Sequence, residues 1–220
     1  IAIVIPTLNE EKFIAQCLDC VIRQTFPFTA IDLMVVDGGS NDRTKSIVEK
    51  YQKRYSNIRF IHNPGRIQSI AFNIGVENSD APYIVRLDAH ALYSMDYIEK
   101  CIDGLQNDSQ IGNVGGRCNI LPFNDTLWAK TNAILNYSRF GIGGSAFRVG
   151  LKPDYVDSVP FGAFPRSVVE KIGGMREDLP RAEDNEYNSR LRKAGYKVFF
   201  NPAIVSSYYA RPTLKASCRQ

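Results

Sequence analysis

Short apolar runs alternate with amphipathic stretches along the first part of the chain. Residues 1–5 form a continuous apolar run and residues 31–36 a nearly continuous one, and each leads through a polar loop into a helical pattern. Two further runs, at residues 58–62 and 83–87, flank another helical pattern at residues 68–76. Strands and helices that alternate at this spacing predict an α/β fold with a mainly parallel sheet and right-handed crossovers.

Polar residues that follow the first two runs predict where the helices begin. Thr7 or Asn9 is expected to cap the first helix, which carries Glu10 and Glu11 in its first turn. The second helix is expected over residues 43–55. Both loops then lie at the carboxyl ends of parallel strands, the edge at which open α/β sheets bind ligands.

The pattern continues less regularly beyond residue 90. Helices are predicted at residues 97–105, 128–137, 167–172 and 181–194, strands at 112–121 and 197–200, and a strand or turn at 156–164. The glycine-rich segment 140–147 lacks the Lys and the strand-to-helix setting of a phosphate-binding loop, so we interpret it as a flexible loop. Gly75, inside the third helical pattern, is small enough to pack closely on a sheet.

Composition fits a single domain over all 220 residues, because 44% hydrophobic content is enough to bury a full core. The formal net charge of +4 comes without a Lys/Arg run or a basic stripe interleaved with aromatic residues, so nucleic-acid binding is not indicated. A nicotinamide oxidoreductase is also disfavoured, because the loop after the first strand has no G-x-G-x-x-G fingerprint.

The five cysteines are odd in number and scattered, which is not the pattern of a disulfide scaffold. Cytosolic, reduced chemistry is therefore expected. Cys17 and Cys20 form a C-x-x-C, but the apolar positions around them have the spacing of a helix face, so we interpret both as core thiols. A second pair that would complete a zinc site is missing from the sequence.

The ends of the chain suggest a piece of a longer protein, cut at both ends. The chain begins without Met inside an apolar strand and stops after Arg219 and Gln220 without a turn or cap. It contains no signal peptide and no apolar run long enough to span a bilayer, which says nothing of the parent protein.

Acidic residues gather at the ends of three predicted elements. Asp88 and His90 follow the strand at residues 83–87, and their i, i+2 spacing would direct both side chains to one side, where they could hold a divalent cation. Taken alone, each group also fits an ordinary turn or helix cap. The three groups are Asp37 with Asp42, Asp88 with His90, and Glu183 with Asp184.

Together these groups resemble family 2 inverting glycosyltransferases. The resemblance rests on five segments in the family's order: VIPTLNE (residues 4–10), VVDGGSNDRT (35–44), AFNIG (71–75), LDAH (87–90) and AEDNE (182–186). It implies the single-domain A-type glycosyltransferase fold, with a Rossmann-like, mainly parallel central sheet flanked by helices. It further implies a nucleotide-binding half over residues 1–90 and an acceptor-binding half over residues 91–220.

The resemblance assigns roles on the donor side of the site. Pro6, Thr7 and Glu10 would line the nucleoside, and Asp37 would accept a hydrogen bond from the base, commonly uracil. Arg66 is either a second cation for the diphosphate or a solvated turn residue.

The resemblance also assigns the reaction. Asp88 matches the first Asp of the family's D-x-D motif and would hold Mn²⁺ or Mg²⁺, whereas His90 replaces the second acid, a departure that leaves its role as a ligand open. Asp184, with Glu183 beside it, matches the E-D motif whose Asp is the catalytic base. That base would take a proton from an acceptor hydroxyl while its oxygen attacks the anomeric carbon opposite the departing diphosphate.

The amino-acid sequences of segments 86–90, 159–164 and 211–220 are similar to those of bacterial exopolysaccharide glucosyltransferases of the succinoglycan type. This similarity implies transfer of glucose from UDP-glucose to a saccharide or lipid-linked saccharide, at the cytoplasmic face of a membrane to which the parent protein is attached. Arg219 and Gln220 resemble the start of the Q-x-x-R-W element of processive members. A nucleotide-sugar-binding or scaffolding domain that has lost catalysis is the alternative; His90 and the cut ends favour it slightly, whereas the retained Glu183 and Asp184 argue against it.

Overall fold

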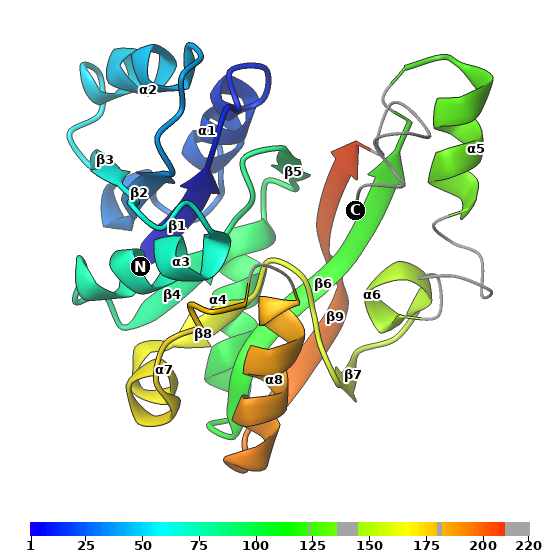
Figure 1. The fold of residues 1–220 in the computed structure, drawn as a ribbon. Coiled ribbons are helices and arrows are strands. Elements are labelled where there is room, and N and C mark those ends of the chain that lie inside the picture. The colour runs from blue at the N-terminus through cyan, green and yellow to red at the C-terminus, as the bar shows by residue number, and fades with distance from the viewer. Residues whose placement is uncertain (123, 136–144, 180–181, 210–220) are drawn as a thin grey trace.

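The computed structural model describes residues 1–220 except 123, 136–144, 180–181 and 210–220 (Figure 1). Its strands join one sheet in the order β3-β2-β1-β4-β8-β6-β9-β5, with β7 paired to β9. The strands are β1 (Ala2–Thr7), β2 (Asp32–Asp37), β3 (Ile58–His62), β4 (Tyr83–Arg86), β5 (Ala91–Tyr93), β6 (Ile111–Leu121), β7 (Asp154–Val156), β8 (Ala163–Pro165) and β9 (Lys197–Tyr209). The helices are α1 (Ile14–Ile22), the 3₁₀ turn η1 (Phe28–Ala30), α2 (Thr44–Gln52), α3 (Gln68–Glu77), α4 (Tyr97–Asn107), α5 (Leu127–Leu135), α6 (Ala146–Val149), α7 (Arg166–Ile172) and α8 (Glu183–Lys193).

The sheet has two parts of different character. Strands β3, β2, β1 and β4 are all parallel, and β6 and β9 form the longest parallel ladder, from Ile111↔Lys197 to Leu121↔Tyr209. The antiparallel pairings through β8, β5 and β7 are short. The α/β class with a mainly parallel sheet and flanking helices, predicted from the sequence, is confirmed.

The central strand β1 is buried on both faces, as its continuous apolar sequence predicts. Ile3 and Ile5 belong to the core on the α1 and α4 side, whereas Ala2 and Val4 belong to the core on the α3 and α8 side. The predicted close packing of Gly75 is confirmed, because a Cβ there would lie 2.3 Å from Val4 Cγ2.

The predicted cap of the first helix is wrong. Helix α1 begins only at Ile14, without a side-chain cap. Thr7 is the last residue of β1 and its hydroxyl donates to the carbonyl of Ile5. Asn9 has a φ of 57° and its side chain accepts a hydrogen bond from the Asn41 N–H. The polar residues after β1 therefore hold two neighbouring loops together instead of starting a helix.

The last strand is more than three times as long as predicted, because β9 continues through Pro202 to Tyr209. The ladder with β6 passes from Gly116↔Asn201 directly to Arg117↔Val205, so residues 202–204 bulge out of the pairing. Pro202 thus sits where no ladder N–H is required. A Cβ on Gly116 would lie 2.0 Å from the Ile204 carbonyl oxygen, so the close approach at the bulge requires glycine.

Other differences from the expected elements are small. Strand β5 was not expected, and the stretch at 156–164 divides into the end of β7, a turn and the start of β8. Most of the glycine-rich segment 140–147, and Arg219 and Gln220, lie outside the described residues. Cys17 is buried in the core, Cys20 is half-buried, and both are free thiols.

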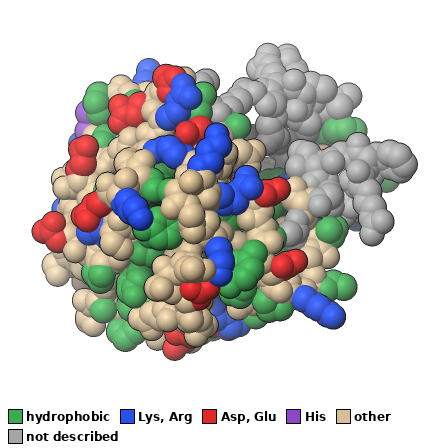
Figure 2. Space-filling view, turned by 90° about the horizontal axis from the view of Figure 1, so that it is seen from below, with side chains coloured by type: hydrophobic (Ala, Val, Ile, Leu, Met, Phe, Trp, Pro, Cys, Tyr) green, Lys and Arg blue, Asp and Glu red, His purple; other side chains and the backbone are tan. Residues whose placement is uncertain are grey.

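Two surface observations bear on partners. Basic and acidic side chains are interspersed on the face seen in Figure 2, where no basic stripe gathers. None of the helices in the described part of the chain has the length and apolar character needed to cross a bilayer.

Candidate functional site

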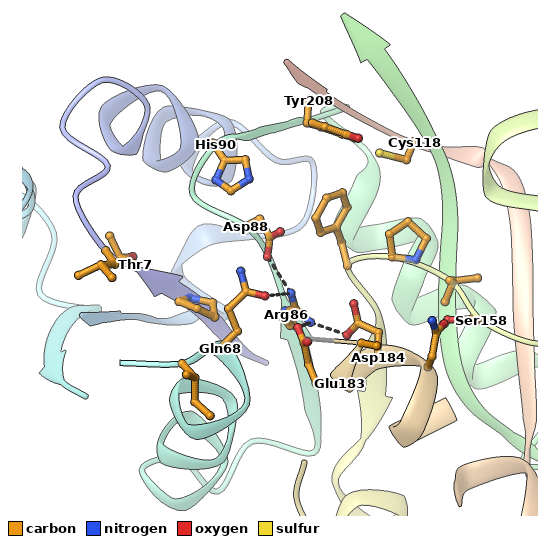
Figure 3. A pocket seen from close by; sticks show the side chains of 18 of the residues that line it. Thr7, Gln68, Arg86, Asp88, His90, Cys118, Ser158, Glu183, Asp184 and Tyr208 are labelled. Carbon is orange, nitrogen blue, oxygen red and sulfur yellow. Dashed lines mark hydrogen bonds and ion pairs between the residues drawn. The ribbon is translucent and has the colours of Figure 1, made fainter. Parts of the chain in front are cut away.

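A pocket of about 940 Å³ opens at the carboxyl ends of β1 and β4, next to the start of α8 (Figure 3). This volume is at the upper end of the usual range for ligand sites, about 300–1,000 Å³. Cys118 and Tyr208, from β6 and β9, lie on the side away from Thr7 and Gln68. Most of the residues assigned from the sequence line this pocket: Pro6, Thr7, Glu10, Arg66, Asp88, His90, Glu183 and Asp184.

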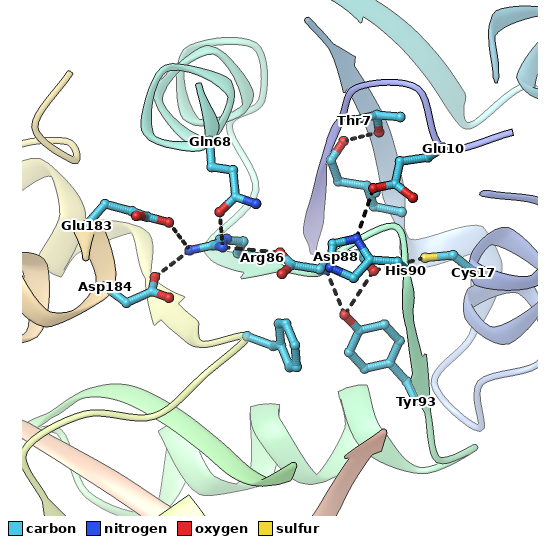
Figure 4. A network of polar contacts seen from close by, with 12 residues as sticks. Thr7, Glu10, Cys17, Gln68, Arg86, Asp88, His90, Tyr93, Glu183 and Asp184 are labelled. Carbon is cyan, nitrogen blue, oxygen red and sulfur yellow. Dashed lines mark hydrogen bonds and ion pairs between the residues drawn. The ribbon is translucent and has the colours of Figure 1, made fainter. Parts of the chain in front are cut away.

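Arg86, the last residue of β4, is the centre of the site and is only 3% exposed (Figure 4). Its Nη1 contacts Asp184 Oδ1 and lies 3.3 Å from Glu183 Oε1. Its Nη2 lies 3.1 Å from Asp88 Oδ1 and donates to Gln68 Oε1 at 2.8 Å. One guanidinium thus joins the acidic groups that follow β4 and begin α8.

Backbone strain is concentrated around this pocket. Four non-glycine residues in the described chain have a left-handed φ, and three of them, Arg66, Phe161 and Ala182, line the pocket. Ala182 has a φ of 59° immediately before the first turn of α8, which carries Glu183 and Asp184. Strain of this kind costs about 1–3 kcal/mol per residue and clusters at ligand sites.

The electrostatics of the cluster set the protonation of Asp184. Burial disfavours the charged form of Arg86, but Asp184, Asp88 and Glu183 outweigh it, so the Arg86 pKa is raised and the guanidinium stays charged. Desolvation raises the pKa of Asp184 to about 6, against the lowering effect of Arg86, while Glu183 and Asp88 raise it further. Since the side chain is still 35% exposed, it remains accessible from the pocket.

Asp88 is held in place through its own backbone. Its N–H donates to the Tyr93 hydroxyl at 2.7 Å, and that hydroxyl lies 3.2 Å from the Asp88 carbonyl oxygen. The thiol of Cys17 donates to the same carbonyl at 3.6 Å. Both Tyr93 and Cys17 are buried, so the position of Asp88 is fixed by the core.

The strand argument for Asp88 and His90 is wrong in its geometry, because β4 ends at Arg86 and both residues lie in the turn that follows. They nevertheless line the same pocket, and His90 Nδ1 lies 2.9 Å from Glu10 Oε1. A carboxylate beside one ring nitrogen orients a metal-binding imidazole in many proteins. Within the described residues no group of three or more His, Cys, Asp or Glu side chains could hold a metal without other ligands.

Asp37 lies outside the pocket lining, one strand away, where it pairs in register with Thr7. Its Oδ2 accepts the N–H groups of Gly39 and Ser40, and its Oδ1 accepts the Ser40 hydroxyl at 2.5 Å. Asp42 likewise binds its own loop, through the Thr44 N–H at 2.9 Å. Both acids therefore match the ordinary turn and cap interpretation that sequence analysis left open.

Sequence analysis missed Arg86, Gln68 and Tyr93 as parts of the site. A signal for Arg86 was present, because an Arg inside an apolar strand is buried only when it is paired. Gln68 and Tyr93 lack a comparable signal, since a helix start and a short strand give ordinary reasons for both.

Comparisons with known proteins agree with this architecture. The sequence model of glycosyl transferase family 2 matches residues 2–173. The Methanococcus voltae protein named dolichyl N-acetyl-alpha-D-glucosaminyl phosphate 3-beta-D-2,3-diacetamido-2,3-dideoxy-beta-D-glucuronosyltransferase is 30% identical over 100% of this chain and 70% of its own length. The succinoglycan biosynthesis protein ExoA of Rhizobium meliloti (strain 1021) is 31% identical over 96% of this chain and 64% of its own length.

Two solved structures share the fold. The mannosyltransferase PcManGT from Pyrobaculum calidifontis, in complex with GDP-Man and Mn²⁺, has a TM-score of 0.75 at 22% identity, over 99% of this chain and 59% of that protein. S. aureus TarS 1-349 in complex with UDP has a TM-score of 0.71 at 16% identity, over 96% of this chain and 60% of that protein. The fold is therefore that of A-type glycosyltransferases, and the chain belongs to glycosyl transferase family 2.

Proposed function

We propose that this domain catalyses inverting transfer of a sugar from a nucleotide-diphosphate sugar to a hydroxyl of a saccharide or lipid-linked saccharide acceptor. The observation that carries the proposal is the meeting of Asp88 and Asp184 on one buried Arg86 in one pocket. These two acids are far apart in sequence, and a base beside a group that binds the diphosphate is what such a transfer needs.

The donor lies, in this proposal, along the half formed by residues 1–90. Pro6, Thr7 and Glu10 offer the loop after β1 to the nucleoside, and Arg66 offers a cation to the diphosphate. Two oxygens of Asp37 already accept hydrogen bonds from its own loop. Asp37 can accept a further hydrogen bond from the nucleobase only through a remaining lone pair. A supporting role through the loop is the simpler assignment for Asp37.

Asp184 is the proposed general base. With a pKa of about 6, Asp184 is mostly ionised at neutral pH. Because this pKa is close to the working pH, the carboxylate can accept a proton effectively. Arg86 orients the carboxylate, and Glu183 shares the same guanidinium. The acceptor hydroxyl gives its proton to Asp184 as its oxygen bonds to the anomeric carbon, and the bond from that carbon to the diphosphate oxygen breaks on the opposite face.

Asp88 and His90 are the proposed protein ligands of a divalent cation, Mn²⁺ or Mg²⁺. They fit as a carboxylate and an imidazole on one pocket wall, and the substrate's diphosphate would have to supply further oxygens. When bound, the cation supplies positive charge to the leaving diphosphate.

UDP-glucose is the proposed donor, and exopolysaccharide synthesis at the cytoplasmic face of a membrane is the proposed setting. The support is the similarity to the succinoglycan biosynthesis protein ExoA and the fold shared with TarS, which was solved with UDP. The chain spans 64% of the former and 60% of the latter, so the activity of the whole protein is part of the proposal.

A panel of donors tests the proposal. UDP-glucose, UDP-N-acetylglucosamine and GDP-mannose are titrated calorimetrically with Mn²⁺, Mg²⁺ or EDTA present, and release of the nucleoside diphosphate is followed. We expect metal-dependent binding of one UDP-sugar, lost in Asp88→Asn and kept in Asp178→Asn, whose exposed carboxylate lies outside the pocket lining. Binding without any release or transfer would instead identify a catalytically inactive nucleotide-sugar-binding domain, and no binding would contradict both functions.

A further inference from the structure

A second buried arginine lines the pocket, and the proposed function does not use it. Arg148, on the short segment α6, is 8% exposed and lies on the pocket lining together with Phe147 and Tyr208. Its Nη2 lies 3.2 Å from the Tyr208 hydroxyl. Its Nε and Nη1 are buried and have no hydrogen-bond partner among the residues that the structure describes.

Arg148 also lacks a counter-charge. It forms no ion pair with any Asp or Glu in the structure, and the segments outside the described residues contain neither residue type. A buried guanidinium is normally paired, because a charge without hydrogen bonds in a low-dielectric interior is strongly unfavourable. The geometry therefore calls for a negative charge that the protein itself does not provide.

Two rings cover the guanidinium and select what can pair with it. Cζ of Arg148 lies 5.4 Å from the Phe147 ring centroid and 5.7 Å from that of Tyr208. Rings stabilise the cation through its faces, so the in-plane donors are what remains for an oxyanion. Nε and Nη1 are shielded from water, so neighbouring side chains have to move when an anion binds.

We propose that Arg148 binds an oxyanion carried by the acceptor, either a phosphate or a carboxylate. This inference rests on the proposed function, since it names the chemical class of the acceptor. Tyr208, the hydrogen-bond partner of Arg148, stands on the pocket side away from Thr7, where the nucleoside is placed (Figure 3). The donor diphosphate, in contrast, is assigned to the side of Asp88 and Arg66.

Binding of three small probes tests the proposal without relying on turnover. Glucose 1-phosphate, methyl glucuronide and methyl glucoside are titrated into the protein preloaded with the nucleotide that binds best in the donor panel. We expect one anionic probe to bind at least tenfold more tightly than methyl glucoside, and Arg148→Met to abolish that preference. Charge-assisted hydrogen bonds of this kind correspond to about 10- to 100-fold in affinity. Which probe gains identifies the source of the oxyanion, phosphate or carboxylate.

Two further variants separate the outcomes. Arg54→Met removes the same charge from an exposed position and should leave the preference intact. Arg148→Lys keeps the charge without the planar fork, so we expect a partial loss, and this variant replaces Arg148→Met if the latter does not fold. Equal binding of all three probes, or unchanged preference in the Arg148 variants, overturns the inference. Weaker nucleotide binding in Arg148→Met also overturns it, because Arg148 would then serve the donor, whereas failure of nucleotide binding in the unaltered protein refutes the proposed function itself.

Discussion

The pocket contains two buried arginines in opposite electrostatic states. Arg86 contacts three carboxylates and the amide oxygen of Gln68, whereas Arg148 has a tyrosine hydroxyl and two aromatic rings for neighbours. The charge of Arg86 is balanced by the protein's own carboxylates, although its Nε has no hydrogen-bond partner among the described residues, and the cluster orders the groups proposed for catalysis. The charge of Arg148 is balanced only with an added anion. Similar burial of the same side chain therefore indicates organisation in one place and recognition in the other.

The largest expected effect is on the base that Arg86 orients. Asp184→Asn should lower transfer by about 10²–10⁴-fold, the range of general-base contributions, with donor binding retained. Because the pKa of Asp184 is higher in the folded than in the unfolded protein, ionising Asp184 lowers the folding stability. This loss begins as the pH rises above the pKa of Asp184 in the unfolded chain and is complete above about pH 6. The melting temperature of Asp184→Asn at pH 7.5 should therefore equal or exceed that of the unaltered protein. Near-normal turnover would remove Asp184 from the role.

The next effect is on folding stability and separates the two arginines directly. Arg86→Met leaves three carboxylates around a buried site without their cation, so urea unfolding at pH 7 should show a loss of about 3–5 kcal/mol. The loss should shrink at pH 5, because carboxylates freed from the cation protonate more easily. Arg148→Met should cause no such loss. Equal losses in both variants would refute the comparison.

A matched control for Arg86→Met exists at the surface. Arg59 pairs with Asp32 at 2.7 Å, and both side chains are about one-third exposed. Exposed pairs contribute about 0–1 kcal/mol, so Arg59→Met should cost less than about 1 kcal/mol for the lost ion pair.

A smaller effect is expected where the core positions Asp88. Tyr93→Phe leaves the Asp88 N–H without its acceptor, which should cost about 1–3 kcal/mol of stability and raise the donor KM more than it lowers kcat. Tyr51→Phe removes a hydroxyl that donates to Asp19 away from the pocket and should leave the donor KM unchanged. If both variants change KM equally, Tyr93 has no specific positioning role.

The smallest effect is a displacement of the pH profile. With Asp184 as base, kcat/KM should fall about tenfold per pH unit as the pH drops below about 6. Glu183 raises the pKa of Asp184, so Glu183→Gln should move this acid limb to lower pH. A limb that moves upward, or stays in place while the variant remains folded, would show that another group titrates.

The sequence predicted the fold well where burial decides it. Continuous apolar runs predicted β1 to β4. Because these strands are parallel, the loops at their carboxyl ends could be predicted to meet at one edge of the sheet. The start of the first helix and the end of β9 were predicted wrongly for the same reason. Asn9 binds a loop 32 residues away, and β9 passes a proline through a bulge that depends on Gly116 of another strand. Local propensity carries no information about such partners.

The site divides in the same way. Asp88 was found because it follows a predicted strand, and Asp184 because it matches the family's E-D motif at the start of a predicted helix. Arg86 could have been found from its place in an apolar strand. Arg148 could not, because four residues of helix next to a glycine-rich stretch give no reason to expect burial. The burial of Arg148 and its lack of an acidic partner among the described residues follow only from the tertiary structure around it.

The bulge at residues 202–204 sets apart the ends of β6 and β9 that carry Cys118 and Tyr208. Beyond it, Ile120 and Ala133 form a small cluster, and Tyr208 packs both against this cluster and against the core that contains Ile3 and Ile5. Substitutions in this outer part can change which molecules the far wall admits without disturbing the nucleotide half. Among relatives with the same architecture, divergence in acceptor choice should therefore accumulate here first.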